Sequence, residues 1–259
     1  DLGLQEVVEK SFGHRRGAVI AIDVRNGEIL AMASFPRPDP NRIRRGSYNA
    51  AVTFHPDKPL VNRVLAEHYA PASTFKVVTA LAGLRSGKLI PHHASYCNGR
   101  FSINKTTWAC WKRGGHGGLD LIGALRHSCN IYFYRLAEHI GLDPILDTAR
   151  LLGFAEAAGL SVGPEAPGVL PTHDYCRERK YWVDERGRKH RLRCTTGDAV
   201  NASIGQGFVT VTPYQLALAY ARIASGKRVE PRVVRRVVTK DGREVIAYKD
   251  ADPPSLGVE

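Results

Sequence analysis

Short apolar runs near both ends of the chain predict β-hairpins. Residues 18–24 and 28–33 enclose the dipeptide Asn26-Gly27, the strongest short-range signal for a tight hairpin turn. Near the other end, residues 233–238 and 244–247 enclose the polar turn Lys240-Asp241-Gly242-Arg243. We therefore expect antiparallel strands at both ends of the sequence.

Helical periodicity occupies the middle of the chain. The pattern covers residues 77–84, 120–140, 143–152 and 213–225. Gly87, Gly141 and Gly153 are placed to end the first three helices, and Pro213 stands at the first position of the last. Residues 35–58 and 160–197 are predicted to be loops. Strands at both ends with helices between them predict an α+β domain with an antiparallel sheet.

Length and charge narrow the class of protein. The chain has 259 residues, 43% of them hydrophobic, which is enough for a sizeable core, and a formal net charge of +12. The basic residues are scattered apart from a cluster at 177–193, and no nucleic-acid-binding motif accompanies them. No apolar run approaches the roughly 20 residues that cross a bilayer. We expect a globular domain that faces anionic surroundings and has no nucleic acid partner.

The first candidate for chemistry is the pair Ser73 and Lys76. The two side chains are one helical turn apart at the start of an apolar helix, so the amine can reach the hydroxyl. A buried lysine can lose its proton and act as a base for a serine nucleophile. Ser102 and Lys105 have the same spacing in a polar stretch, where loop residues are expected. The spacing alone leaves open a capping serine followed by a solvated lysine.

A second candidate motif is Ser128-Cys129-Asn130, at a junction between helical segments. Its hydroxyl and amide, two residues apart, could exchange a proton with Lys76 and hold a substrate amide. Ser47-Tyr48-Asn49 repeats the spacing inside the proline-rich connection. Taken alone, each is also compatible with a capping or core serine.

Ordered blocks of sequence carry a resemblance to a known family. The blocks are Asn62-Arg63-Val64-Leu65, Tyr69-Ala70-Pro71-Ala72-Ser73-Thr74-Phe75-Lys76, Ser128-Cys129-Asn130, Ile204-Gly205-Gln206-Gly207 and Thr212-Pro213-Tyr214-Gln215. With them the chain resembles the penicillin-binding protein 2 family, the class B peptidoglycan transpeptidases of cell elongation. The first predicted hairpin and Phe35-Pro36 extend the resemblance over nearly all of the chain.

The resemblance implies a fold and a reaction. The fold is that of penicillin-binding proteins and serine β-lactamases, with a helical subdomain that carries the first two motifs. Ser73 would attack a D-Ala-D-Ala stem peptide, with Lys76 as base, Ser128 as proton relay and Asn130 binding the peptide amide. The backbone N–H of Ser73 would form half of the oxyanion hole. β-Lactams should acylate the same serine.

One departure from the family pattern concerns its third motif. Lys-Thr-Gly or Lys-Ser-Gly is absent, and Thr195-Thr196-Gly197 lacks the lysine and precedes Gly205. We therefore expect residues 1–259 to be a transpeptidase domain fragment, truncated before the third-motif strand and without its N-terminal anchor and pedestal. Such a fragment should turn over poorly.

Cysteines supply an independent signal. Cys97, Cys110, His116 and Cys129 follow one another at gaps of 13, 6 and 13 residues, and three thiols with one imidazole form a closed zinc set. If Ser128 and Asn130 face the cleft, Cys129 faces away from it. We expect a structural zinc that fastens the segment 91–118 behind the second motif, with disulfide-bonded or merely buried cysteines as the alternative.

The two remaining cysteines, Cys176 and Cys194, flank the basic cluster. The sequence does not decide between a disulfide and two free thiols. The resemblance further implies a location on the periplasmic face of the inner membrane and a glycosyltransferase partner. Two rival functions stay open at this point, a serine β-lactamase of the same fold and a non-catalytic module that binds cell-wall peptides.

Overall fold

The computed structural model describes residues 1–41, 52–90, 92, 94–247 and 252–257, and it separates into two compact units. Unit 1 comprises residues 1–69, 152–168 and 211–259, and unit 2 comprises residues 70–151 and 169–210. Ser47-Tyr48-Asn49 lies outside the described residues.

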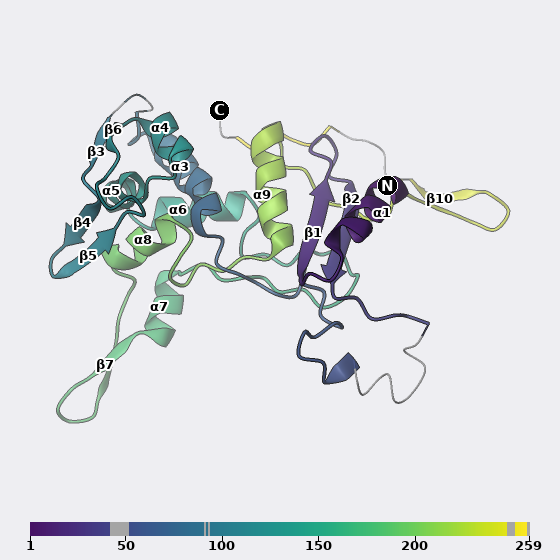
Figure 1. Cartoon of the computed structure of the whole chain (residues 1–259), viewed down its shortest axis with the longest axis horizontal. Helices are drawn as coiled ribbons and strands as arrows, with labels where there is room; N and C mark the ends of the chain where they lie inside the picture. The colour runs from purple at the N-terminus through teal and green to yellow at the C-terminus, as the bar shows by residue number, and fades with distance from the viewer. Residues whose placement is uncertain (42–51, 91, 93, 248–251, 258–259) are drawn as a thin grey trace. The chain divides into compact units, whose positions relative to one another are not determined.

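In the described part of the chain, unit 1 contains the β1–β2 and β9–β10 hairpins and the helices α1 and α9 (Figure 1). Its elements are α1 (Leu2–Phe12), β1 (Gly17–Ile22), β2 (Ile29–Phe35), α9 (Pro213–Ser225), β9 (Arg236–Val238) and β10 (Glu244–Ala247). Strands β1 and β2 pair antiparallel from Gly17 opposite Phe35 to Ile22 opposite Ile29. Helix α9 packs on β1, and α1 packs on β2.

The core of unit 1 forms between α9 and the β1–β2 sheet. Its buried members are Val64, Leu65, Tyr214, Leu218, Ala221 and Val229. Helix α9 is well delimited because Thr212 and Gln215 form a reciprocal capping box at its start, and Gly226 takes a left-handed conformation at its end.

Unit 2 holds most of the helices. Its helical elements are the 3-10 turn η1 (Ala72–Phe75), α3 (Lys76–Arg85), α4 (Leu121–Arg126), α5 (Asn130–Ile140), α6 (Asp143–Leu151), α7 (His173–Arg179) and α8 (Thr196–Ser203). Its strands are β3 (Ser95–Cys97), β4 (Arg100–Ile103), β5 (Thr106–Ala109), β6 (Gly117–Leu119), β7 (Tyr181–Val183) and β8 (Lys189–Arg191). The strands pair antiparallel as β3–β6, β4–β5 and β7–β8.

Helix α3 lies at the centre of unit 2, in contact with α5 and α6, while α5 also packs on α8. Phe75, Val78, Phe133 and Ile145 are almost fully buried in this packing. The Thr79 hydroxyl donates to the carbonyl of Ser203 at 2.8 Å, which fastens α3 to the end of α8. The first two motifs therefore lie on helices with a shared core.

The structure confirms both predicted hairpins, the α+β composition and the helix ends at Gly87 and Gly141. The helix expected over 120–140 is interrupted, because Ser128 has a left-handed φ of 50° and Cys129 is extended. The loop expected over 160–197 was wrong in part. That region contains α7, the β7–β8 hairpin and the first residues of α8, and a disulfide joins Cys176 to Cys194.

Candidate active site

Ser73 lies in a tight turn whose neighbouring residues are anchored by a backbone hydrogen bond and by a buried side chain. The preceding residue, Ala72, has a φ of 50°, a conformation that costs a non-glycine residue free energy. Its N–H donates to the carbonyl of Gly205 at 3.0 Å, and the side chain of Phe75 is fully buried. Ser73 itself is exposed. The turn therefore presents the hydroxyl on a strained but well-anchored backbone.

Lys76 begins α3 and is almost completely buried, with 1% of its surface exposed. Its Nζ donates to Ser73 Oγ at 3.2 Å and to Asn130 Oδ1 at 2.7 Å. It also lies 2.8 Å from the carbonyl oxygen and 3.0 Å from the Oγ of Ser128. Four oxygens from both motifs thus surround one amine.

Burial lowers the pKa of Lys76 to about 8, because desolvation penalises the ammonium. Negative charge on Cys110 and Cys129 acts in the opposite direction and is the smaller influence. An amine with this pKa is partly neutral near pH 7, as a general base must be. The environment therefore suits Lys76 to accept a proton from a neighbouring hydroxyl.

The second motif faces two ways. Ser128 and Asn130 point their side chains at Lys76, whereas Cys129, between them, is fully buried among the other cysteines. The alternation follows from the backbone, which is left-handed at Ser128, extended at Cys129 and helical from Asn130 onward. One tripeptide therefore belongs to two clusters.

The second cluster consists of Cys97, Cys110, His116 and Cys129, whose ligand atoms all lie within 4.8 Å of one another. The three cysteines are free thiols, so the disulfide alternative does not hold for them. The Sγ atoms of Cys97 and Cys110 are each 3.6 Å from His116 Nδ1. A tetrahedral zinc with ordinary bond lengths separates a sulfur and a nitrogen ligand by about 3.6 Å. The donor set and its spacing therefore fit zinc.

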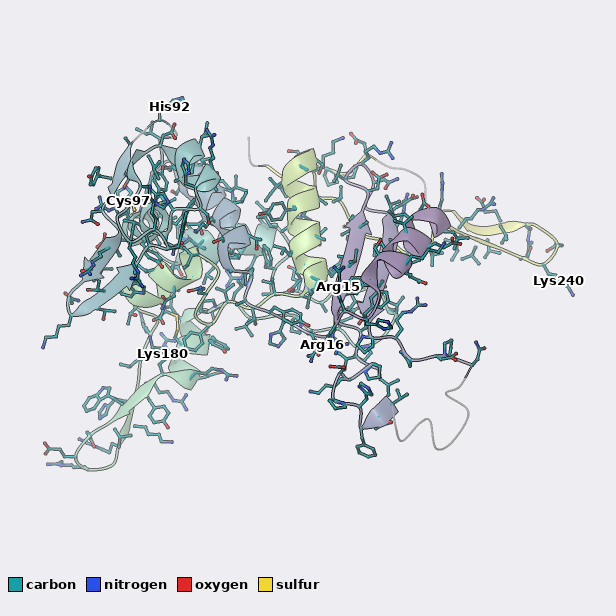
Figure 2. The ribbon with its side chains drawn as sticks, in the orientation of Figure 1. Arg15, Arg16, His92, Cys97, Lys180 and Lys240 are labelled. Atoms are coloured by element: carbon teal, nitrogen blue, oxygen red, sulfur yellow. A yellow bond between two sulfur atoms is a disulfide. The ribbon has the colours of Figure 1, made fainter. Side chains whose placement is uncertain are left out.

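Local backbone geometry builds this cluster. A Cβ on Gly115 would lie 2.1 Å from the carbonyl oxygen of Cys97, and one on Gly99 would lie 2.2 Å from that of Arg113. Only glycine permits the two loops to approach so closely. Figure 2 shows Cys97 within the strands and helices of unit 2. Burial lowers the pKa of His116, which favours the neutral imidazole that a metal binds.

Some supporting contacts carry no sequence signal. Trp108 donates its Nε1–H to Asn201 Oδ1 at 2.9 Å, which links β5 to α8. Trp111 donates to the carbonyl of His127 at 3.1 Å. The Asp198 carboxylate caps α8 and pairs with Lys180 at 2.6 Å. Such pairs lie far apart in sequence and follow no motif spacing.

Comparison with known proteins gives consistent results. The sequence family described as the penicillin binding protein transpeptidase domain matches residues 17–256. Peptidoglycan D,D-transpeptidase MrdA of Acinetobacter baumannii is 34% identical over 241 residues, which are 91% of this chain and 34% of that protein. The chain thus spans about a third of the length of this relative.

Solved structures agree with the sequence match. Pseudomonas aeruginosa PBP2, in complex with WCK 5153, superposes with a TM-score of 0.82 at 30% identity, over 97% of this chain and 58% of that one. A chain from a peptidoglycan synthase complex that coordinates polymerization and crosslinking has a TM-score of 0.75 at 28% identity, over 99% and 45% of the two chains. The fold expected from the sequence is confirmed.

Proposed function

The chain belongs to the penicillin-binding protein transpeptidase family, of the PBP2 and MrdA type, and we propose that Ser73 forms its acyl-enzyme on peptidoglycan stem peptides. The observation that carries the proposal is the set of four oxygens around the buried Lys76. The family match supports the reaction class, and the arrangement of side chains supports the role that we propose for each residue.

Counting donors explains why Lys76 can act as a base. An ammonium has three N–H donors for four oxygens, so it cannot satisfy all of them at once. A neutral amine has two donors and one lone pair. The carbonyl oxygens of Ser128 and Asn130 can only accept, so they take the two N–H groups. The lone pair is then left for a hydroxyl proton, from Ser73 or Ser128.

The proposed acylation follows from this count. Ser73 Oγ attacks the carbonyl carbon before the terminal D-alanine, and its proton passes to Lys76 Nζ. The C–N bond breaks, and Ser128 relays the proton from Lys76 to the departing amine, which leaves as D-alanine. The Asn130 Nδ2 group contacts the Ala109 carbonyl at 3.5 Å, a distance long enough for a substrate carbonyl to replace it. An amine from a neighbouring strand then takes the acyl group from Ser73.

The cysteine and histidine cluster has a structural part in the proposal. Cys97, Cys110, His116 and Cys129 would hold a zinc ion with no open position, so the ion would stabilise the fold and take no part in the reaction. Its effect on the active site runs through the backbone of Cys129. A fixed Cys129 fixes Ser128 and Asn130 on either side.

The rate of this chain by itself is a separate matter. The sequence contains no Lys-Thr-Gly or Lys-Ser-Gly, the motif that in the family contacts the substrate carboxylate. We therefore expect Ser73 to be acylated slowly. Rapid stoichiometric labelling by a fluorescent penicillin would contradict this expectation while still supporting Ser73 as nucleophile.

Partners and location belong to the same proposal. The similar synthase complex supports a glycosyltransferase partner that polymerises glycan strands. The Cys176–Cys194 disulfide supports an oxidising compartment such as the periplasm. None of the helices in the described ranges is both long and apolar enough to cross a membrane. We propose that the protein works on the periplasmic face of the inner membrane.

Intact mass spectrometry tests the nucleophile. After long incubation with excess penicillin, the chain should gain one penicilloyl mass, and Ser73→Ala should gain none. Ser102→Ala is the matched control, because Ser102 and Lys105 repeat the spacing while the Ser102 hydroxyl pairs with that of Thr107 at 2.8 Å. An adduct that survives on Ser73→Ala would refute the assignment.

The same experiment separates the rival functions. A penicilloyl adduct that persists for hours argues against a serine β-lactamase, which must deacylate quickly. Stem-peptide binding without any adduct would instead favour a non-catalytic binding module. For the metal, the mass of the chain measured under native conditions should exceed the mass measured under denaturing conditions by about one zinc ion. Equal masses in both spectra would remove zinc from the proposal.

A further inference from the structure

The β7–β8 hairpin is an exposed feature of unit 2 that the acyl-enzyme chemistry does not use (Figure 1). The segment 177–193 contains eight lysine or arginine residues and three acidic ones. Its first strand also exposes three large apolar side chains, with Tyr181 50%, Trp182 52% and Val183 52% accessible. Aromatic and cationic groups thus share one short hairpin.

Pairing across the hairpin sorts these side chains into two faces. Tyr181 stands opposite Arg191, and Val183 stands opposite Lys189, whose Nζ lies 4.6 Å from the Tyr181 ring centroid. On the other face, the ring of Trp182 stacks on His190 at 4.3 Å with an interplanar angle of 15°. The stack holds the indole flat, with about half of its surface exposed to solvent.

The hairpin is rigid at its turn and at its base. The Asp184 carboxylate accepts from the N–H groups of Arg186 and Arg188 at 3.0 and 2.9 Å, and it contacts His190 Nε2 at 3.0 Å. At the base, the disulfide between Cys176 and Cys194 closes the segment. An ordered surface loses less conformational entropy when it binds a ligand.

The base also connects the hairpin to the active-site helices. Lys180 pairs with Asp198 in the first turn of α8, at 2.6 Å. Helix α8 packs on α5, which begins at Asn130. Through Ser203, α8 also accepts the hydrogen bond from Thr79 of α3. A ligand held by the hairpin would therefore be held relative to both motifs.

We propose that the β7–β8 hairpin binds a peptidoglycan strand, with its exposed aromatic rings against sugar rings and its cations against carboxylates. The inference rests on the proposed function, which gives the substrate as a polymer of sugars with acidic peptides. Charge complementarity supports it, because the basic excess of the segment matches carboxylates, which arginine binds well. Exposed, rigid aromatic rings supply contact area at low entropic cost.

The position of the polar residues favours a polymer over a lipid surface. The tip of the hairpin carries Asp184, Glu185 and Arg186, all charged, while the apolar side chains lie along the stem. A hairpin that inserts into a membrane would have to bury this charged tip first, which is costly. A linear polymer can instead lie along the stem and avoid the tip.

Co-sedimentation with purified, insoluble peptidoglycan sacculi tests the inference. The double variant Tyr181→Ala/Trp182→Ala should bind sacculi at least about fivefold more weakly than the parent chain. The control Arg236→Gln/Lys240→Gln removes two charges from the exposed β9–β10 hairpin and should bind like the parent. A second variant replaces residues 181–191 with a Gly-Ser loop and keeps Cys176 and Cys194. Circular dichroism and an intact disulfide establish that each variant is folded.

All of these chains are compared in a Ser73→Ala background, so that binding does not depend on acylation. Unchanged sacculus binding in both hairpin variants would overturn the inference, whatever the penicillin labelling shows. Equal or tighter binding to phosphatidylglycerol vesicles, lost in the same variants, would overturn it in favour of a lipid surface. Hairpin-dependent binding to sacculi, together with no penicillin labelling of Ser73 in the parent chain, would leave the inference standing and refute the acyl-enzyme.

Discussion

Gly205 is the residue whose replacement tests the anchoring of the nucleophile most directly. Its φ is 65°, and a Cβ there would lie 2.5 Å from the carbonyl oxygen of Ala72 and 2.7 Å from Phe75 Cβ. Two costs follow for Gly205→Ala. The left-handed conformation costs about 1–2 kcal/mol with a side chain, and overpacking of a tight site costs about 1–3 kcal/mol more.

The chain offers a control that separates these costs. Gly87 has nearly the same φ, 68°, but no atom lies within 4 Å of its would-be Cβ. Gly87→Ala should therefore lose only the conformational part, about 1–2 kcal/mol. The loss of chain entropy in the unfolded state is common to both variants and cancels. We expect Gly205→Ala to be less stable than Gly87→Ala by about 1–3 kcal/mol.

Tryptophan fluorescence during urea unfolding gives a clean assay. All three tryptophans, Trp108, Trp111 and Trp182, lie in unit 2, as do both glycines, so the signal reports the unit that is perturbed. The displaced Ala72 should also slow penicillin labelling of Ser73 beyond any slowing in Gly87→Ala. Equal unfolding midpoints and equal labelling in the two variants would refute the close packing of Gly205 under the nucleophile turn.

Three further predictions concern ionisation, metal and disulfide. Burial lowers the pKa of Lys76 to about 8, and the neutral amine is the base. The rate of Ser73 labelling should therefore rise about tenfold from pH 7 to pH 9. A rate that does not change with pH would exclude Lys76 as the titrating base. A strong chelator should lower the melting temperature and slow Ser73 labelling, while Cys129→Ser, measured by zinc content, should already lack the ion; unchanged stability after complete metal loss would contradict the structural role. Replacing both Cys176 and Cys194 by serine should lower the free energy of unfolding by ~3 kcal/mol in urea titrations, and a chain of parental stability would show that the bridge constrains little.

Local chemistry explains which elements could be predicted. Asn26-Gly27 predicts its hairpin because the turn itself needs those residues, and Thr212, Pro213 and Gln215 are capping residues that begin a helix wherever they stand. Helix α8 was not predicted, although Thr195 and Asp198 carry the same kind of signal, a reciprocal capping box. That capping box follows a segment rich in charged residues, and no apolar periodicity there indicates a helix.

The β7–β8 hairpin could not be predicted in the same way. Its strands are three residues long, and they show no alternation of buried and exposed positions, because all of β7 is exposed and no residue of β8 is buried. What orders it is tertiary, namely the disulfide at its base and the hydrogen bonds to Asp184 at its turn. Both cysteines are visible in the sequence, but their spacing does not show that they are close enough to form a disulfide.

The candidate site divides along the same line. Ser73 and Lys76 are close because they are one turn apart, so their spacing predicts their contact. The burial of Lys76 and its bond to the carbonyl of Ser128, 52 residues away, depend on how α3 packs on α5. Spacing predicts which groups are present, and packing sets the pKa that lets them react.

The double role of Ser128-Cys129-Asn130 has a consequence for inhibition and resistance. A compound that binds the thiols of Cys97, Cys110 and Cys129 does not have to contact Ser73 or Lys76. It nevertheless perturbs the motif from its buried side. This route is separate from the side of the motif that faces Lys76. A substitution of Cys129 would change the residue between the two groups that bond to Lys76. The tripeptide can therefore be perturbed from two sides, through the groups that contact Lys76 and through the thiol of Cys129.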